Sequence, residues 1–346
     1  MESKKAKAKR GIADKLAGTE LRGTRRRDAG LILLIAFAGM IACAPELRAS
    51  QLNLPPEATD GLNLLYTGQP SRALPLFQKI EQEQPESPLG YLLEAEAQWW
   101  AMYCEACEIQ WGFVDTWKEP SRAQGDAYLA LLDKATQLAE TSIAKQDSAE
   151  MELYDGTSYM LQARLLGLRD DRRGTAHAGV EGREHLLRCL QLNPQMADAY
   201  TGLGLYNYYV DTLSALARVL RFFMGIPGGD KRTGIQQLRT AMQQGELTNV
   251  EARFYLAKNL RTYDFQYEEA ADVLAPLVRE YPENPVFALL MGNLYAKLAR
   301  NDTAATYFRS VENEASSGAS VDAACQERAS ELAREFLDQL SHPGGS

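Results

Sequence analysis

A repeat with a period of 34 residues constrains the fold of this chain more than any other feature of its sequence. Near the C-terminal end, a set of small and large apolar positions recurs at this spacing: Ala270, Leu274 and Leu277, then Ala304, Phe308 and Val311. A period of this length in a helix-rich sequence indicates stacked helix pairs, because each pair can bury its apolar face only against its neighbours. The sequence therefore predicts an all-α solenoid.

An upstream copy of the repeat occupies residues 54–87. Its packing positions are Gly61, Leu64, Gly68, Ala73, Phe77, Ile80 and Pro85. This pattern resembles the signature of the tetratricopeptide repeat (TPR) family, in which small residues let two helices approach closely and large ones fill the gap to the next repeat. The resemblance covers most of residues 54–340 and implies a right-handed α-solenoid of helical hairpins.

The repeat is regular at its ends and irregular in the middle. Further clear copies lie at about 251–283 and 285–315, whereas an aromatic helical stretch at 88–118 holds all four tryptophans. A loop is expected at 170–180, and an insertion at 211–231 delays the second helix of one pair to about 232–244. The amphipathic stretch 320–340 is expected to cap the exposed end of the solenoid.

A second resemblance covers residues 200–310. The segment 222–231, with the sequence FFMGIPGGDK, is similar to a junction in the eukaryotic inclusion-body clearance TPR proteins, which are membrane- or droplet-associated adaptors. Its glycines and lysine do not fit the phosphate-binding GxxxxGK spacing followed by Ser or Thr, so a tight turn between helices is expected.

The N-terminus has the pattern of an export or anchoring segment. Residues 1–30 contain ten basic and four acidic residues, and an apolar run follows at 31–44. Its end, Ala42-Cys43, resembles a bacterial lipobox, which implies a lipid-anchored mature protein that begins at Cys43. Ala44 in place of Asp favours the outer membrane. Ordinary cleavage, which would give a free periplasmic protein, and an uncleaved inner-membrane anchor remain alternatives.

These features predict four segments with different roles. They are a basic region plus signal peptide or anchor at 1–44, a linker at 45–53, the TPR-like domain at 54–340 and a disordered tail at 341–346. The chain from residue 31 onward holds 27 basic and 42 acidic residues, a net charge of −15. Such a body is repelled by phosphate backbones, which argues against nucleic-acid binding.

Candidate chemistry is sparse. Cys104 and Cys107 form a CxxC that could be a redox pair, but could equally be two core residues or a simple disulfide. The chain has only three histidines, and no arrangement of them suggests a nucleophilic triad or a metal site. The sequence therefore predicts no enzyme, no cofactor and no metal.

The TPR resemblance implies a partner-binding groove lined by the first helix of each repeat. On this basis Tyr255, Asn259, Asn293 and Lys297 are expected to face the groove, with the two asparagines stacked 34 residues apart. The predicted function is a cell-envelope scaffold that binds a protein or peptide. Two alternatives are a transporter-associated ligand-binding lipoprotein, resembling TRAP T-components, whose tryptophans at 99–117 line a pocket, and a thiol-dependent enzyme using Cys104 and Cys107.

Overall fold

The structure is a computed structural model that describes residues 52–107, 122–212, 225–317 and 321–342. The chain divides into Met1–Ala49 and Ser50–Ser346, and every described residue belongs to the second unit. Cys43, the predicted linker up to residue 51, and the tail at 343–346 therefore lie outside the described residues. No helix within the described ranges is long and apolar enough to cross a membrane.

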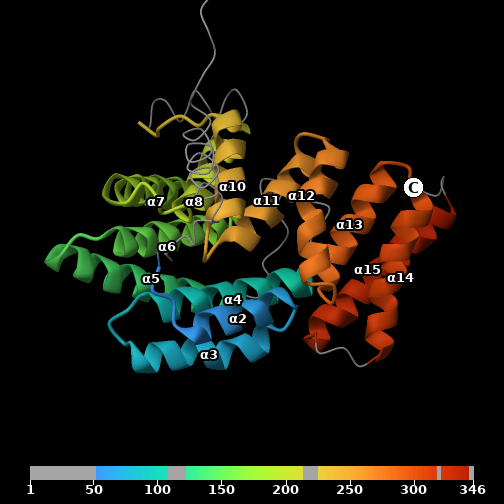
Figure 1. The fold of residues 1–346 in the computed structure, drawn as a ribbon, viewed down its shortest axis with the longest axis horizontal. Helices are drawn as coiled ribbons and strands as arrows, with labels where there is room; N and C mark the ends of the chain where they lie inside the picture. Colours follow the sequence, from blue (N-terminus) through green and yellow to red (C-terminus); the bar gives the residue numbers. More distant parts are fainter. Residues whose placement is uncertain (1–51, 108–121, 213–224, 318–320, 343–346) are drawn as a thin grey trace, which may run out of the picture. The chain divides into compact units, whose positions relative to one another are not determined.

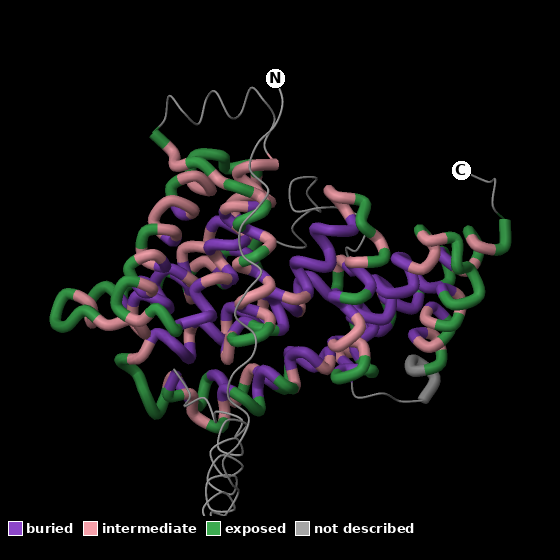
Figure 2. Tube along the Cα trace, turned by 45° about the horizontal axis from the view of Figure 1, so that its top comes forward, coloured by how far each residue is buried: buried purple, intermediate pink, exposed green. Residues whose placement is uncertain are grey.

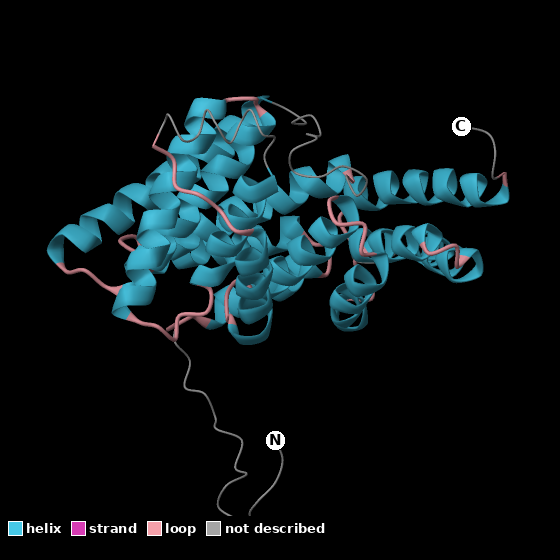
Figure 3. Ribbon diagram, turned by 90° about the horizontal axis from the view of Figure 1, so that it is seen from above, coloured by secondary structure: helices cyan, strands magenta, loops and turns pink. Residues whose placement is uncertain are grey.

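The described part of the chain is built from thirteen α-helices and contains no strand (Figure 3). The helices are α2 (Pro56–Tyr66), α3 (Pro70–Glu83), α4 (Leu89–Ala106), α5 (Arg122–Lys145), α6 (Ala149–Leu168), α7 (Arg172–Leu192), α8 (Ala199–Thr212), α10 (Lys231–Gln244), α11 (Asn249–Thr262), α12 (Tyr267–Glu280), α13 (Pro285–Lys297), α14 (Asn301–Ser317) and α15 (Ala323–Ser341).

The helices pack as six consecutive pairs followed by α15 (Figure 1). The pairs are α2 with α3, α4 with α5, α6 with α7, α8 with α10, α11 with α12, and α13 with α14. In most cases the second helix of a pair also packs against the first helix of the next. This arrangement confirms the predicted α-solenoid of TPR-like hairpins.

One contact between a glycine and a large side chain holds the pairs together. It recurs as Gly61 with Phe77, Gly156 with Leu186, Gly204 with Leu238 and Gly292 with Phe308. A methyl group on Gly61 would lie 2.2 Å from the Phe77 ring, and one on Gly292 would lie 2.5 Å from the Phe308 ring. Two pairs of the irregular middle, α6 with α7 and α8 with α10, therefore keep the glycine contact of the regular ends.

Two expectations about the middle need correction or refinement. The stretch 170–180 is not a loop, because α7 begins at Arg172. Asp171 causes this early start, since its carboxylate accepts a hydrogen bond from the backbone N–H of Gly174 at 2.9 Å and so caps the helix. The predicted delayed helix is present as α10, and the glycine-containing junction before it ends at Asp230, which caps α10 through the N–H of Thr233.

The turns inside four pairs share a left-handed residue. Gly68, Asp170, Phe265 and Ala299 have φ angles of 85°, 56°, 55° and 56°. In the three turns other than that of Phe265, the next residue donates its N–H to the carbonyl five positions back, as Arg300 does to Tyr295 at 2.9 Å. The left-handed conformation costs an L-residue about 1–2 kcal/mol, and only the first of the four is glycine.

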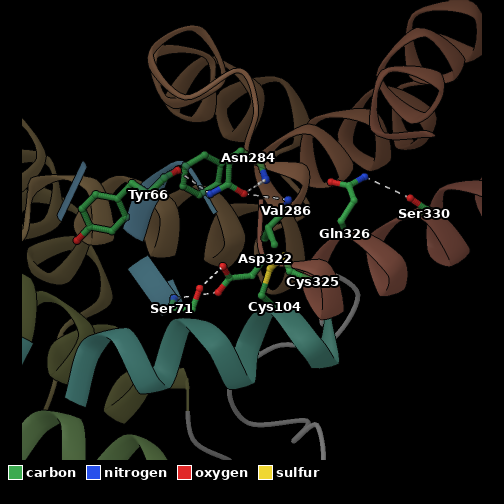
Figure 4. The surroundings of a disulfide bond; sticks show 10 residues. Tyr66, Ser71, Cys104, Asn284, Val286, Asp322, Cys325, Gln326 and Ser330 are labelled. Atoms are coloured by element: carbon green, nitrogen blue, oxygen red, sulfur yellow. Dashed lines mark hydrogen bonds between the residues drawn. A yellow bond between two sulfur atoms is a disulfide. The ribbon is translucent and has the colours of Figure 1, made fainter. Parts of the chain in front are cut away.

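The two ends of the solenoid are joined covalently. A disulfide links Cys104, near the end of α4, to Cys325 in the first turn of α15, with 4.9 Å between the Cα atoms (Figure 4). Beside it the carboxylate of Asp322 accepts the N–H of Ser71 at 2.9 Å, and the N–H of Asp322 donates to the carbonyl of Gly68 at 2.9 Å.

A second tie joins the turn before α13 to the end of α2. The amide nitrogen of Asn284 donates to the carbonyl of Tyr66 at 2.8 Å, while its side-chain oxygen accepts the N–H of Val286 at 2.9 Å and caps α13 (Figure 4). The predicted C-terminal helix α15 is thus confirmed, but it does more than cover the last repeat. It closes the solenoid onto its own first three helices.

This closure generates a stability prediction. The variant Cys325→Ser is expected to have a free energy of unfolding lower by about 2–5 kcal/mol, because the disulfide joins residues 221 positions apart and restricts the unfolded chain. Urea unfolding followed by circular dichroism measures the change. Reductant should lower the wild-type midpoint to that of the variant and leave the variant unchanged; equal midpoints for oxidised and reduced wild type would contradict the prediction.

Candidate functional site

The predicted groove residues are mostly not at a surface. Tyr255, Asn259 and Asn293 are 6%, 1% and 6% exposed, and only Lys297 is exposed. Nearly every residue of α11 and the greater part of α13 are buried, as the tube in Figure 2 shows. The expectation that these three side chains line an open groove is therefore wrong, although a contact between Lys297 and a partner stays a prediction.

Aromatic side chains of α4 pack against α11 and α13, the two helices from which side chains were expected to bind a partner. The Trp100 ring lies 5.1 Å from that of Phe254 and 6.1 Å from that of Phe287, measured between centroids. Tyr103 adds an edge-to-face contact with Phe254 at 5.6 Å. Because aromatic rings contribute large apolar area, this packing makes α4 a permanent part of the core rather than a wall of a groove.

The two asparagines bind their own chain. The Asn259 side-chain oxygen accepts a hydrogen bond from the Tyr209 hydroxyl at 2.9 Å, and that of Asn293 accepts one from Nε of Arg261 at 2.7 Å. Each amide oxygen is thus engaged with a different neighbour within the fold. Their spacing of 34 residues reflects the repeat and does not produce a ladder that could hold a peptide backbone.

The centre of the molecule contains a buried charge network around Arg164, which is 7% exposed. Its guanidinium donates to Oε1 of Glu96 at 2.8 Å and lies 3.4 Å from Oε1 of Glu251. The hydroxyls of Tyr128 and Tyr255 accept from the same group at 3.0 Å and 3.2 Å. One side chain of α6 therefore joins α4, α5 and α11.

Trp99 belongs to this network because its indole ring packs against the Arg164 guanidinium. The Arg164 guanidinium carbon lies 3.8 Å from the centroid of the indole ring, a cation–π distance. The indole Nε1–H donates to the Tyr255 hydroxyl at 3.1 Å. Trp99 is therefore a structural member of the core.

The network carries two carboxylates for one guanidinium. Burial raises the pKa of Glu96 well above its usual value, and the positive charge of Arg164 only partly offsets this effect. The neighbouring Glu251 carboxylate raises the pKa of Glu96 further.

A small cavity lies beside these two carboxylates. It is lined by Tyr66, Glu96, Thr157 and Glu251 among others, and has room for about one water molecule. Neither Trp99 nor Trp100 lines it, and Trp111 and Trp117 lie outside the described residues. The expected tryptophan-lined pocket is therefore not formed by the two tryptophans that the structure describes.

A second cluster of titratable groups lies between α6 and α7. The His185 ring is placed between two carboxylates, with Nδ1 2.7 Å from Glu152 and Nε2 3.4 Å from Asp155. Tyr159 stacks on the ring at 5.8 Å. The two carboxylates approach opposite edges of the imidazole, so they cannot chelate one ion together with it. Across the described ranges no group of three or more His, Cys, Asp or Glu is placed to hold a metal.

The candidate thiol site is not a Cys104–Cys107 pair. Cys104 is bonded to Cys325, and Cys107 is a buried residue with a left-handed backbone directly after α4. Cys104 therefore has no thiol in this structure. The simple disulfide considered for the CxxC is not formed either, because the partner of Cys104 is 221 positions away.

The Arg164 network was not predicted from the sequence. Glu96 gives no clear signal there, because Glu94 and Gln98 flank it in the same helix. Nothing in the sequence links it to Arg164 or Glu251, which lie 68 and 155 positions further along the chain. A buried acid predicts a buried base, but it does not say which one.

No protein-family model matches the sequence, and no curated protein matches it significantly. Among solved structures, the fold is similar to the crystal structure of TTC0263, a thermophilic TPR protein of Thermus thermophilus. The match has a TM-score of 0.41 and 17% sequence identity, and it covers 70% of this chain and 97% of the other. Similarity at this level carries no argument about function, and the description of the hairpins rests on their own contacts.

The buried network predicts a large effect of removing its cation. Arg164→Met should lower the free energy of unfolding by about 3–5 kcal/mol, because it leaves buried carboxylates without their donor. The matched control is Arg188→Met, which removes a surface ion pair with Asp147 and should cost less than about 1 kcal/mol. Urea unfolding of both variants at about pH 7 makes the comparison, and equal losses would contradict a special role for Arg164.

The second cluster predicts a pH dependence. Burial raises the pKa of Asp155 to about 7, with Glu140, Glu152 and Glu181 adding to the rise and His185 opposing it. The folded protein then binds more protons than the unfolded chain between about pH 4 and 7, so this group lowers stability as the pH rises through that window.

The variant Asp155→Asn should remove this part of the decline. Urea midpoints measured from about pH 4.5 to 8 are expected to fall less steeply for the variant than for the wild type. Asp302→Asn changes an exposed carboxylate on α14 and should keep the wild-type slope. An unchanged slope in Asp155→Asn would show that another group carries the dependence.

Proposed function

We propose that this chain is a non-enzymatic scaffold of the cell envelope, tethered through a lipidated Cys43, that binds a protein partner on its outer surface. In a solenoid of six hairpins, each pair packs mainly on its neighbours, so its outer face is left for contacts with a partner. The concave faces are used for contacts within the chain, so the proposal moves the partner from the groove to the outside.

The observation that carries the proposal is the Cys104–Cys325 disulfide. Disulfides of this kind form and persist in oxidising compartments, and they are rare in the cytosol. The bond is formed between helices at opposite ends of the domain, with 4.9 Å between the Cα atoms, so it belongs to the completed fold. This supports the export that the basic and apolar N-terminal pattern predicts independently.

The transporter-associated alternative receives no comparable support. It relied on tryptophans that line a ligand pocket, and the indoles of Trp99 and Trp100 pack instead against Arg164 and Phe254. A cavity for about one water is too small for an organic solute. The scaffold is therefore the function that we retain.

One experiment tests compartment and partner together. Intact cells are treated with an amine-reactive cross-linker, and the protein is purified from the envelope under non-reducing conditions and analysed by mass spectrometry. We expect a mature N-terminus at Cys43 that carries lipid, a Cys104–Cys325 peptide pair, and a cross-link to another envelope protein.

The variant Cys43→Ala is the control, because it should lose the lipid mass while keeping the disulfide. Recovery of the wild type with an unprocessed or unlipidated N-terminus would overturn the tether. Recovery of the chain without any cross-linked protein would overturn the scaffold.

A further inference from the structure

We propose that one edge of the C-terminal hairpins, formed by Phe265, Tyr267, Tyr295 and Tyr307, is the surface that binds the protein partner, through an apolar contact face on that partner. We name these four side chains the aromatic edge. The inference rests on the proposed scaffold function and specifies where its partner binds.

The four rings form two pairs on neighbouring hairpins. Phe265 and Tyr267 meet edge to face at 6.4 Å at the turn into α12, and Tyr295 stacks on Tyr307 at 5.7 Å between α13 and α14. Phe265 is exposed, and the three tyrosines are half-buried. Each pair therefore presents part of an aromatic surface to solvent.

Arg300 connects the two hairpins that carry these pairs. Its guanidinium lies 5.9 Å from the Tyr295 ring centroid and pairs with Glu268 in the first turn of α12 at 2.8 Å. This ion pair links the turn after α13 to the start of α12, where Phe265 and Tyr267 lie. Exposed aromatic residues of this kind supply most of the binding energy in protein interfaces.

Phe265 has two properties that core packing does not explain. Its side chain is 68% exposed. Among the described residues, the one other exposed large apolar side chain is that of Leu192, at 38%. Its φ of 55° is a left-handed conformation that disfavours a bulky residue. Glycine would suit this turn better, so a large ring here costs stability on two counts.

The charges around the edge determine the kind of partner. Glu268 is paired with Arg300, Glu269 with Arg239, and Asp264 with Lys231, so the edge has little net charge of its own. An anionic membrane surface requires a cluster of unpaired basic residues, and the acidic body, at −15, would be repelled by it. We therefore assign the edge to a protein with a pocket for an aromatic ring.

The test compares glycine variants at two positions that have the same left-handed backbone conformation. Phe265→Gly and Ala299→Gly both relieve a left-handed residue, with φ of 55° and 56°, but only the first removes a ring of the aromatic edge. Both variants should unfold at urea concentrations equal to or higher than that of the wild type. Loss of binding in Phe265→Gly then cannot come from unfolding.

The partner is found by photo-crosslinking in cells. Benzoylphenylalanine is placed at position 265, and at position 192 as a control, since Leu192 is the other exposed large apolar residue of the described chain. The protein that cross-links from 265 but not from 192 is identified and purified. Its dissociation constant for each variant is then measured by titration calorimetry. We expect at least about tenfold weaker binding by Phe265→Gly and less than about twofold by Ala299→Gly.

Four results would overturn the inference. They are a cross-link to a second copy of this chain, a cross-link to lipid only, equal cross-linking from position 192, and unchanged affinity of Phe265→Gly for the identified protein. In the last case the scaffold function would stand and only the location of its binding surface would be wrong. Failure of every envelope protein to cross-link from any site would instead remove the scaffold function itself.

Discussion

The contact between α4 and the inner faces of α11 and α13 is the constraint on which the rest of the molecule depends. An open solenoid of helical hairpins leaves its concave face free for a ligand. Here Trp100 packs on Phe254 and Phe287, Tyr103 packs on Phe254, and the residues predicted to line the groove on α11 and α13 are buried except for Lys297. Once this contact forms, α4 in the second hairpin and α15 after the last hairpin are neighbours, and the disulfide from Cys104 to Cys325 can fix them. A repeat protein thereby gains long-range contacts that stacked pairs alone lack.

Closing the solenoid also explains why charges are buried at its centre. Arg164 and Glu251 lie on helix faces that an open solenoid would expose to water, and closure removes the water. The contacts of Arg164 with Glu96 and Glu251 then replace solvent. Such a network adds little net stability compared with apolar packing. Its geometry does require α4, α5, α6 and α11 to meet in one arrangement, which we take to be its contribution to the fold.

The sequence was sufficient to predict the local part of this structure, which is the packing of each hairpin on its neighbours. Periodicity in Ala270, Leu274 and Leu277 predicted the hairpins because each repeat packs on its neighbour, and the amphipathic stretch at 320–340 predicted α15. Closure was not predictable, because no periodic signal relates Cys104 to Cys325. The concave placement of Tyr255, Asn259 and Asn293 failed for the same reason, since it assumed an open face.

A smaller error came from local chemistry. The polar run at 170–173 was interpreted as a loop, whereas Asp171 caps a helix that begins one residue later. Polar composition alone does not distinguish a loop from a capped helix start, because both favour aspartate.

The four left-handed turns show how equivalent positions of a repeat acquire different roles. Glycine suits position 68 in two respects: its φ of 85° disfavours a side chain, and a methyl group there would approach Val321 to 3.2 Å. Asp170 precedes the residue that caps α7, and Ala299 leads into Arg300, which pairs with Glu268. Only Phe265 places a large apolar ring in solvent at this position. The inner faces are occupied by the chain itself, so hairpins with the same packing can still differ at these turns. The exposed ring of Phe265 is such a difference, and core packing does not account for it.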